Sequence, residues 1–307
     1  MKRVSRVRLA WRCCSVLAVL AVCVVIDIAL PGPQIVVAQE PIEMEVALVA
    51  RATQPGEVVR VDVMCNCGDV APRVSVLDRN ISLALSPDGS RWQGLIGIDL
   101  DVEPGEYPLV VSAPHLRPPQ AREMSLSVEP KQFRTRTLQV APQYVDPEPA
   151  VVDRIVREAA QLNGIYRIET PRLWDQPFVS PLTTQPSENF GSRSVFNGQP
   201  RSPHAGIDFG SPRGTVVTAP SPGKVVIADD LFFTGNTVVL DHGVGLYSIF
   251  AHFSALEVDN GDIVGLGDTL GRVGATGRVT GPHLHWSVRL SGARVDPMSL
   301  IKATEDR

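Results

Sequence analysis

Hydrophobic and polar positions alternate between residues 41 and 130 with a period of two, the side-chain period of a β-strand. Runs of strand length end at turn signals rich in proline, glycine and aspartate. The runs are Glu57–Val63, Arg73–Leu77, Ser82–Leu85 and Tyr107–Val111. About seven short strands in roughly 90 residues are typical of an immunoglobulin-like β-sandwich. We therefore predict such a domain over residues 41–130, where no His, Cys, Asp or Glu cluster has catalytic spacing.

The pattern changes over residues 131–188, which we predict to be a linker with one helix. Apolar residues recur at helical spacing from Pro147 to Asn163, and Gly164 stands where helices commonly end. The stretch that follows contains prolines that argue against regular structure, namely Pro171, Pro177, Pro181 and Pro186. Such a segment can lie across a neighbouring domain as a lid or simply join two domains, and the sequence leaves both possibilities open.

Residues 189–302 again predict short strands, now separated by glycine-bearing turns. The predicted strands cover Gly214–Pro220, Gly223–Ala228, Asn236–Leu240, Leu246–Phe250, Asp262–Val264 and Thr269–Val273. We therefore predict a mainly β protein. It has an N-terminal immunoglobulin-like β-sandwich, a helical and proline-rich linker, and a C-terminal antiparallel all-β domain.

The first 38 residues have the pattern of an export signal. Basic residues, among them Lys2, Arg3 and Arg12, precede an apolar run from Cys13 to Ile26. This run suits the hydrophobic part of a signal peptide and is short for a transmembrane helix, which needs about 20 residues. We predict export to the periplasm or cell envelope. Residues 1–38 then act as a cleaved signal peptide or as a retained inner-membrane anchor.

Charge and cysteine content exclude some classes of function. A net charge of −4, with no concentrated basic stretch beyond the N-terminal segment, argues against nucleic-acid binding. Membrane contact is expected only through the N-terminal segment. Cys65 and Cys67 are too few for a zinc site, and export would allow a disulfide bond between them despite the tight loop. Whether they are joined is left open.

Histidines concentrate in the C-terminal part of the chain. His283 and His285 are separated by one residue in a predicted strand, so both imidazoles project from the same face. His204 and Asp208 flank Gly206 in a bent strand or loop, so both side chains could reach one ion. His, Asp and a third His can form a three-ligand zinc site with an open position for water. Taken alone, the pair of histidines could equally be exposed polar strand residues.

Several motifs in the C-terminal part together resemble the lysostaphin-type (LytM-like) zinc metallopeptidases that cut peptidoglycan cross-bridges. These motifs are Phe190–Arg193, Asn197–Asp208, Gly235–Gly243, Phe250–His252 and Thr276–Trp286. By position, the resemblance implies that His204, Asp208 and His285 bind one zinc ion. It also implies that His252 and His283 are catalytic and share the proton transfers of hydrolysis by a zinc-activated water. Which histidine accepts the first proton is left open.

The resemblance implies an exported zinc metalloendopeptidase that acts on the cross-link peptides of peptidoglycan. If the source has an outer membrane, the expected bond joins D-alanine to diaminopimelate. A regulatory protein is a further partner that we leave open. Two other hypotheses remain: a catalytically inactive LytM-like module that binds the wall or activates an amidase, and an enzyme held latent by its linker or first domain.

Overall fold

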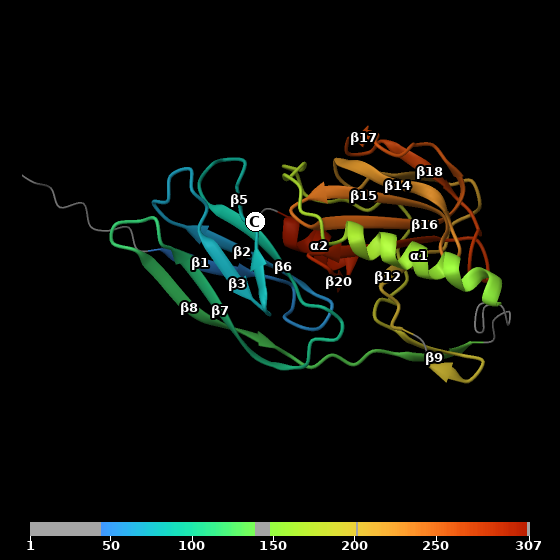
Figure 1. Ribbon diagram of the computed structural model, residues 1–307, viewed down its shortest axis with the longest axis horizontal. Coiled ribbons are helices and arrows are strands. Elements are labelled where there is room, and N and C mark those ends of the chain that lie inside the picture. Colours follow the sequence, from blue (N-terminus) through green and yellow to red (C-terminus); the bar gives the residue numbers. More distant parts are fainter. Residues whose placement is uncertain (1–43, 139–147, 201, 306–307) are drawn as a thin grey trace, which may run out of the picture. The chain divides into compact units, whose positions relative to one another are not determined.

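The computed structural model describes residues 44–138, 148–200 and 202–305 (Figure 1). The predicted signal segment, residues 1–38, lies outside the described residues. Those residues all belong to one compact unit, residues 42–307. Within the described part, no helix has both the length and the apolar character needed to cross a membrane.

The N-terminal part consists of two antiparallel sheets of four strands each (Figure 1). One sheet has the order β1-β2-β6-β5, with β1 (Glu45–Val49), β2 (Val58–Met64), β5 (Ala84–Leu85) and β6 (Trp92–Gly97). The other has the order β4-β3-β7-β8, with β3 (Arg73–Val76), β4 (Arg79–Ile81), β7 (Gly105–Ala113) and β8 (Gln120–Val128). Alternate side chains from both sheets share one apolar core that includes Val61, Ile96, Leu109 and Leu126. Cys65 and Cys67 are joined by a disulfide bond.

The C-terminal part is built on a nine-stranded sheet whose main path is β12-β19-β16-β15-β14-β17, with every pair antiparallel. Its long strands are β14 (Gly223–Leu231), β15 (Gly235–Gly243), β16 (Leu246–Leu256) and β19 (Leu284–Leu290). The short ones are β12 (Gly206–Phe209), β13 (Val216–Thr218), β17 (Ile263–Val264), β18 (Thr269–Val273) and β20 (Ala293–Val295), and helix α2 (Pro297–Thr304) follows. The prediction of a mainly β protein with antiparallel sheets is confirmed.

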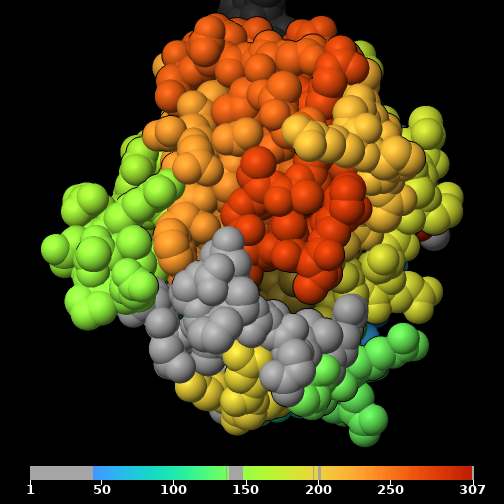
Figure 2. Space-filling model, turned by 90° about the vertical axis from the view of Figure 1, so that its right-hand side faces the viewer, coloured from blue at the N-terminus to red at the C-terminus, as the bar shows by residue number. Residues whose placement is uncertain are grey.

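The segment between the two sheet systems packs against the C-terminal sheet and does not simply link two domains. Helix α1 (Pro149–Ile165) places Leu162 and Ile165 against Tyr247 and neighbouring residues of β14–β16. On the face shown in Figure 2, α1 (light green) lies at the margin and orange-red atoms of the C-terminal part lie at the centre. Residues 166–192 contain neither helix nor strand, as their prolines predict, yet Phe178 and Leu182 enter the C-terminal core.

A short strand in this segment was not predicted. β9 (Thr135–Leu138) pairs in parallel with β10 (Arg193–Phe196), which also pairs with β11 (Gln199–Pro200). The segment that leaves the N-terminal sandwich is thereby hydrogen-bonded to the hairpin that immediately precedes His204.

The N-terminal sandwich also contacts the end of the chain directly. Val58 and Leu95 belong to the C-terminal core, and the Val58 N–H donates to Ser299 Oγ at 2.8 Å. The Arg294 side chain binds the carboxylate of Asp99. These contacts combine apolar packing with one buried hydrogen bond and one half-buried ion pair, so the sandwich packs against the C-terminal sheet as a support.

Candidate metal centre

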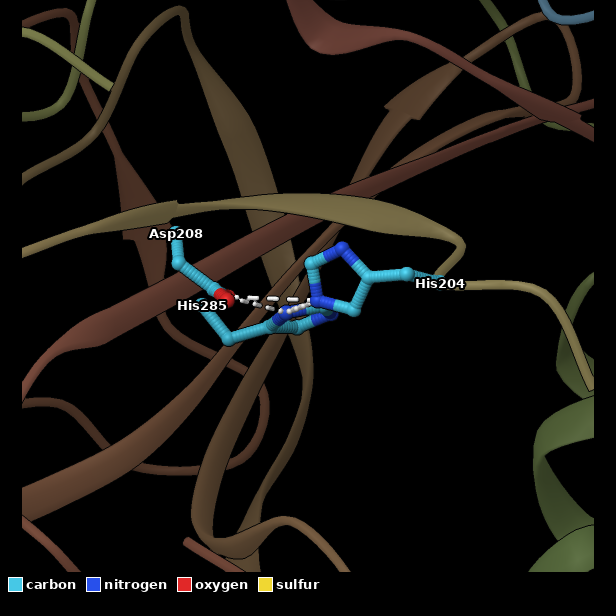
Figure 3. A group of neighbouring side chains, drawn as sticks. All are labelled: His204, Asp208 and His285. Carbon is cyan, nitrogen blue, oxygen red and sulfur yellow. Dashed lines mark hydrogen bonds and ion pairs between the residues drawn. The ribbon is translucent and has the colours of Figure 1, made fainter. Parts of the chain in front are cut away.

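Three of the residues singled out by the sequence converge on one point (Figure 3). His204 Nε2 lies 3.1 Å from His285 Nδ1 and 3.2 Å from Asp208 Oδ1. His285 Nδ1 lies 2.9 Å from the same carboxylate oxygen. A tetrahedral zinc ion with bonds of about 2.0–2.1 Å separates its ligand atoms by roughly 3.4 Å. The triangle of two imidazole nitrogens and one carboxylate oxygen is therefore close to the size that such an ion requires.

The strand register explains how residues far apart in the chain meet here. Asp208 of β12 and His285 of β19 are direct cross-strand partners, so their side chains leave the same face of the sheet. Gly206 is the first residue of β12, and a side chain would not fit at this position. A Cβ atom on Gly206 would lie 2.8 Å from the His285 ring and 2.5 Å from the Trp286 carbonyl oxygen.

Asn189 connects two members of the cluster. Its side-chain Nδ2 donates to Asp208 Oδ2 at 2.7 Å, and its carbonyl oxygen accepts from His204 Nδ1 at 3.2 Å. The proton on Nδ1 leaves the lone pair of His204 Nε2 directed at the cluster. Sequence reasoning missed this residue, although it directly precedes the Phe190–Arg193 motif.

The two histidines expected to be catalytic stand beside the cluster. The His252 ring centre lies 4.8 Å from that of His283 and 6.0 Å from that of His285. His252 Nδ1 donates to the Thr276 carbonyl oxygen at 2.9 Å, and His283 Nδ1 donates to the Gly281 carbonyl oxygen at 2.9 Å. In each ring Nε2 therefore carries a lone pair that can accept a proton. His283 Nε2 lies 3.8 Å from Asp208 Oδ1. The structure thus brings all five predicted site residues together.

His252 reaches this position through an unusual backbone conformation. Its φ angle is 69°, in the left-handed region that residues with a side chain rarely adopt. The pairing of β16 with β15 changes register around it, and its N–H bonds to the Thr234 carbonyl oxygen at 2.9 Å. Such bulges redirect a side chain, and strain of about 1–3 kcal/mol persists where the surroundings hold it.

Burial and hydrogen bonds set the charge of the cluster. Burial alone would raise the pKa of Asp208, but its contacts with the imidazoles of His204 and His285 outweigh burial and hold that pKa well below its usual range. Burial lowers the pKa of His252 to about 3 and also lowers the pKa of His285. At neutral pH Asp208 is therefore a carboxylate and His285 an uncharged imidazole, and both are donors that a divalent metal ion binds.

This arrangement of ligands and free histidines defines a metallopeptidase-like centre, and comparisons with known proteins identify the family. Residues 202–297 match the family model described as Peptidase family M23. A crystal structure of a putative peptidase M23 from Pseudomonas aeruginosa covers 83% of this chain and 97% of its own, at 34% identity and a TM-score of 0.64. The chain therefore belongs to peptidase family M23.

Curated relatives match over the C-terminal part. The DD-carboxypeptidase/endopeptidase Mpg of Neisseria meningitidis is 39% identical over 103 residues, which is 34% of this chain and 24% of that protein. The peptidoglycan DD-endopeptidase ShyA of Vibrio cholerae is 39% identical over 113 residues, 36% of this chain and 26% of that protein. The matched segment thus spans about a quarter of each of these relatives.

Proposed function

We propose that this chain is an exported zinc metalloendopeptidase that hydrolyses the peptide cross-links of peptidoglycan. The observation that carries the proposal is the convergence of His204, Asp208 and His285 on one point, with His252 and His283 beside it, in a member of family M23. The names of the curated relatives support the choice of peptidoglycan as substrate.

The donor set fits zinc. His204, Asp208 and His285 would hold the ion through two imidazole nitrogens and one carboxylate oxygen, which is the ligand count of a catalytic site that keeps one position open. Once bound, zinc lowers the pKa of a water molecule and polarises a carbonyl oxygen placed against it. The carbonyl oxygen of Asn189 keeps His204 in the tautomer that can act as a ligand.

His252 and His283 supply the proton transfers. Carbonyl oxygens hold the Nδ1–H of each ring, so each Nε2 can accept a proton from the attacking water or, once protonated, return it to the leaving amine. The protonated ring also stabilises the negative charge that develops on the substrate oxygen. Because the two ring centres are 4.8 Å apart, both can serve one scissile peptide bond.

The relatives' designation as DD-endopeptidases favours a bond between two D-configured centres, such as D-alanyl-diaminopimelate, over a bond within oligoglycine. We propose that residues 1–38 direct the chain to the periplasm or cell envelope, where this substrate lies. An inactive module that binds the wall or activates an amidase would need neither the complete ligand set nor both free histidines.

The test is mass analysis of muropeptides after incubation of purified peptidoglycan with the zinc-loaded chain beginning at residue 39. We expect cross-linked dimers to be converted to monomers at the D-alanyl-diaminopimelate bond. His252→Ala should keep one zinc ion per chain and lose hydrolysis, whereas His285→Ala should lose both. His115→Ala, a change in a turn of the sandwich, is the matched control and should retain both. Intact cross-links with the wild-type chain would overturn the proposal.

A further inference from the structure

We propose that Asn189 is a positioning residue that sets the geometry of two metal ligands, Asp208 and His204, without touching the metal itself. The inference rests on the proposed function, because it concerns how this chain holds the ion. It assigns a purpose to a buried amide that lies outside the ligand set and outside the pair of catalytic histidines.

The side chain of Asn189 contacts both the carboxylate and the backbone N–H of Asp208. Its Nδ2 donates to Asp208 Oδ2 at 2.7 Å, and its Oδ1 accepts from the Asp208 backbone N–H at 3.3 Å. The bond to Oδ2 stops the carboxylate from rotating and leaves Oδ1 to face His204 and His285. The amide carries both the donor and the acceptor that this double contact needs, on two separate atoms.

The backbone of Asn189 acts on the other ligand. Its carbonyl oxygen accepts from His204 Nδ1 at 3.2 Å, which orients the imidazole and fixes its tautomer. Flanking backbone bonds hold Asn189 in place: Ser187 N–H donates to the Asp208 carbonyl oxygen at 2.8 Å, and Gly191 N–H donates to the His204 carbonyl oxygen at 2.8 Å. Residues 187–191 therefore lie along both ligands.

Burial makes these contacts effective. Asn189 is only 5% exposed, so water cannot readily replace its amide against Asp208. Removing an outer-shell partner of a metal ligand typically weakens metal affinity about 10–100-fold. Without the amide, the Asp208 carboxylate can turn, and Oδ1 loses its fixed direction toward the imidazoles.

The test compares the chain beginning at residue 39 with Asn189→Leu and Asn189→Ala, which remove the amide and keep the backbone carbonyl. Asn189→Leu also keeps most of the side-chain volume, so it guards against loss of folding through a cavity. The matched control is Asn260→Ala, which removes an amide that accepts from the Ala228 backbone N–H in an exposed loop. Zinc affinity is measured by competition with a chelator, the cobalt-substituted protein by its visible absorption spectrum, and the metal-free protein by thermal unfolding.

We expect zinc affinity to fall about 10–100-fold in both Asn189 variants. The cobalt spectrum should change shape, and the control should match wild type. Affinities within twofold of wild type and an unchanged cobalt spectrum would overturn the role of Asn189 while leaving the peptidase proposal intact. If the wild-type chain itself binds no zinc, the proposed function fails first, and the two failures are distinguishable.

Discussion

A half-buried ion pair joins the N-terminal sandwich to the end of the C-terminal sheet, and replacing Asp99 by asparagine tests its contribution. The Arg294 backbone N–H and Nε donate to Asp99 Oδ2 at 2.7 and 3.0 Å, and the guanidinium also reaches Oδ1. The two side chains are 19% and 16% exposed, whereas Asp101, the second carboxylate on Arg294, is 74% exposed. Asp101→Asn is therefore the matched control.

The pKa of Asp99 gives the expected magnitude. Burial alone would raise that pKa, but hydrogen bonds from Arg294 outweigh it and lower it from 3.8 to about 2. A difference of nearly two units corresponds to about 2 kcal/mol of stability at neutral pH. Because the pKa is depressed in the folded state, this contribution is complete above about pH 5. Roughly half remains at pH 3, and it nearly vanishes at pH 2.

The assay is urea unfolding of the chain beginning at residue 39, with a chelator present so that metal release does not enter. Asp99→Asn should lower the free energy of unfolding by about 2 kcal/mol at pH 7, equivalent to roughly 5 °C in Tm, and by about half as much at pH 3. Asp101→Asn should change it by less than about 0.5 kcal/mol. An Asp99→Asn effect that is absent at pH 7, or unchanged by pH, would refute the reasoning.

Three further changes test other parts of the fold. Gly206→Ala should weaken zinc binding at least about tenfold, because the new methyl group pushes against His285. Gly210→Ala, whose methyl group meets nothing within 4 Å, should leave zinc affinity unchanged. Chelator competition measures both affinities, and equal values would contradict the steric argument. Val244→Asn should raise Tm by about 2–4 °C because φ is 48° there, in a turn that favours Asn-Gly; a lower Tm would exclude strain at this position. Truncation to residues 188–307 removes four residues of the C-terminal core, namely Val58, Leu95, Phe178 and Leu182. Because each large core residue contributes about 2–5 kcal/mol, the truncation should lower Tm by more than about 10 °C. A truncated chain that stays stable and gains hydrolysis would instead favour the latent enzyme.

Local patterns predicted the elements well. The period of two located most strands, and helical spacing predicted a helix over 147–163 where the structure has Pro149–Ile165. Prolines correctly indicated the irregular stretch that follows. For the site, the one-residue spacing of His283 and His285 and the motif that contains His204 and Asp208 pointed to residues that the structure brings together, while the choice of ligands and the inclusion of His252 came from the family resemblance.

Features that depend on contacts between distant parts of the chain could not be predicted. The pairing of β9 with β10, the amide of Asn189 against Asp208, and the link from Asp99 to Arg294 all join residues whose local sequence carries no sign of their partner. The left-handed backbone of His252 could not be predicted either, because it is the surrounding sheet that holds a residue with a side chain in that conformation.

The order of strands around the metal centre has a consequence for the chain during its synthesis. Asp208 lies on β12, the outermost strand of its sheet path, and within the described residues that strand pairs only with β19, which comes far later in the chain. Until β19 pairs with β12, Asp208 and His285 are not held together and the candidate metal centre is incomplete. The candidate metal centre is therefore assembled by long-range strand pairing, and it forms only when folding of the C-terminal sheet is nearly complete.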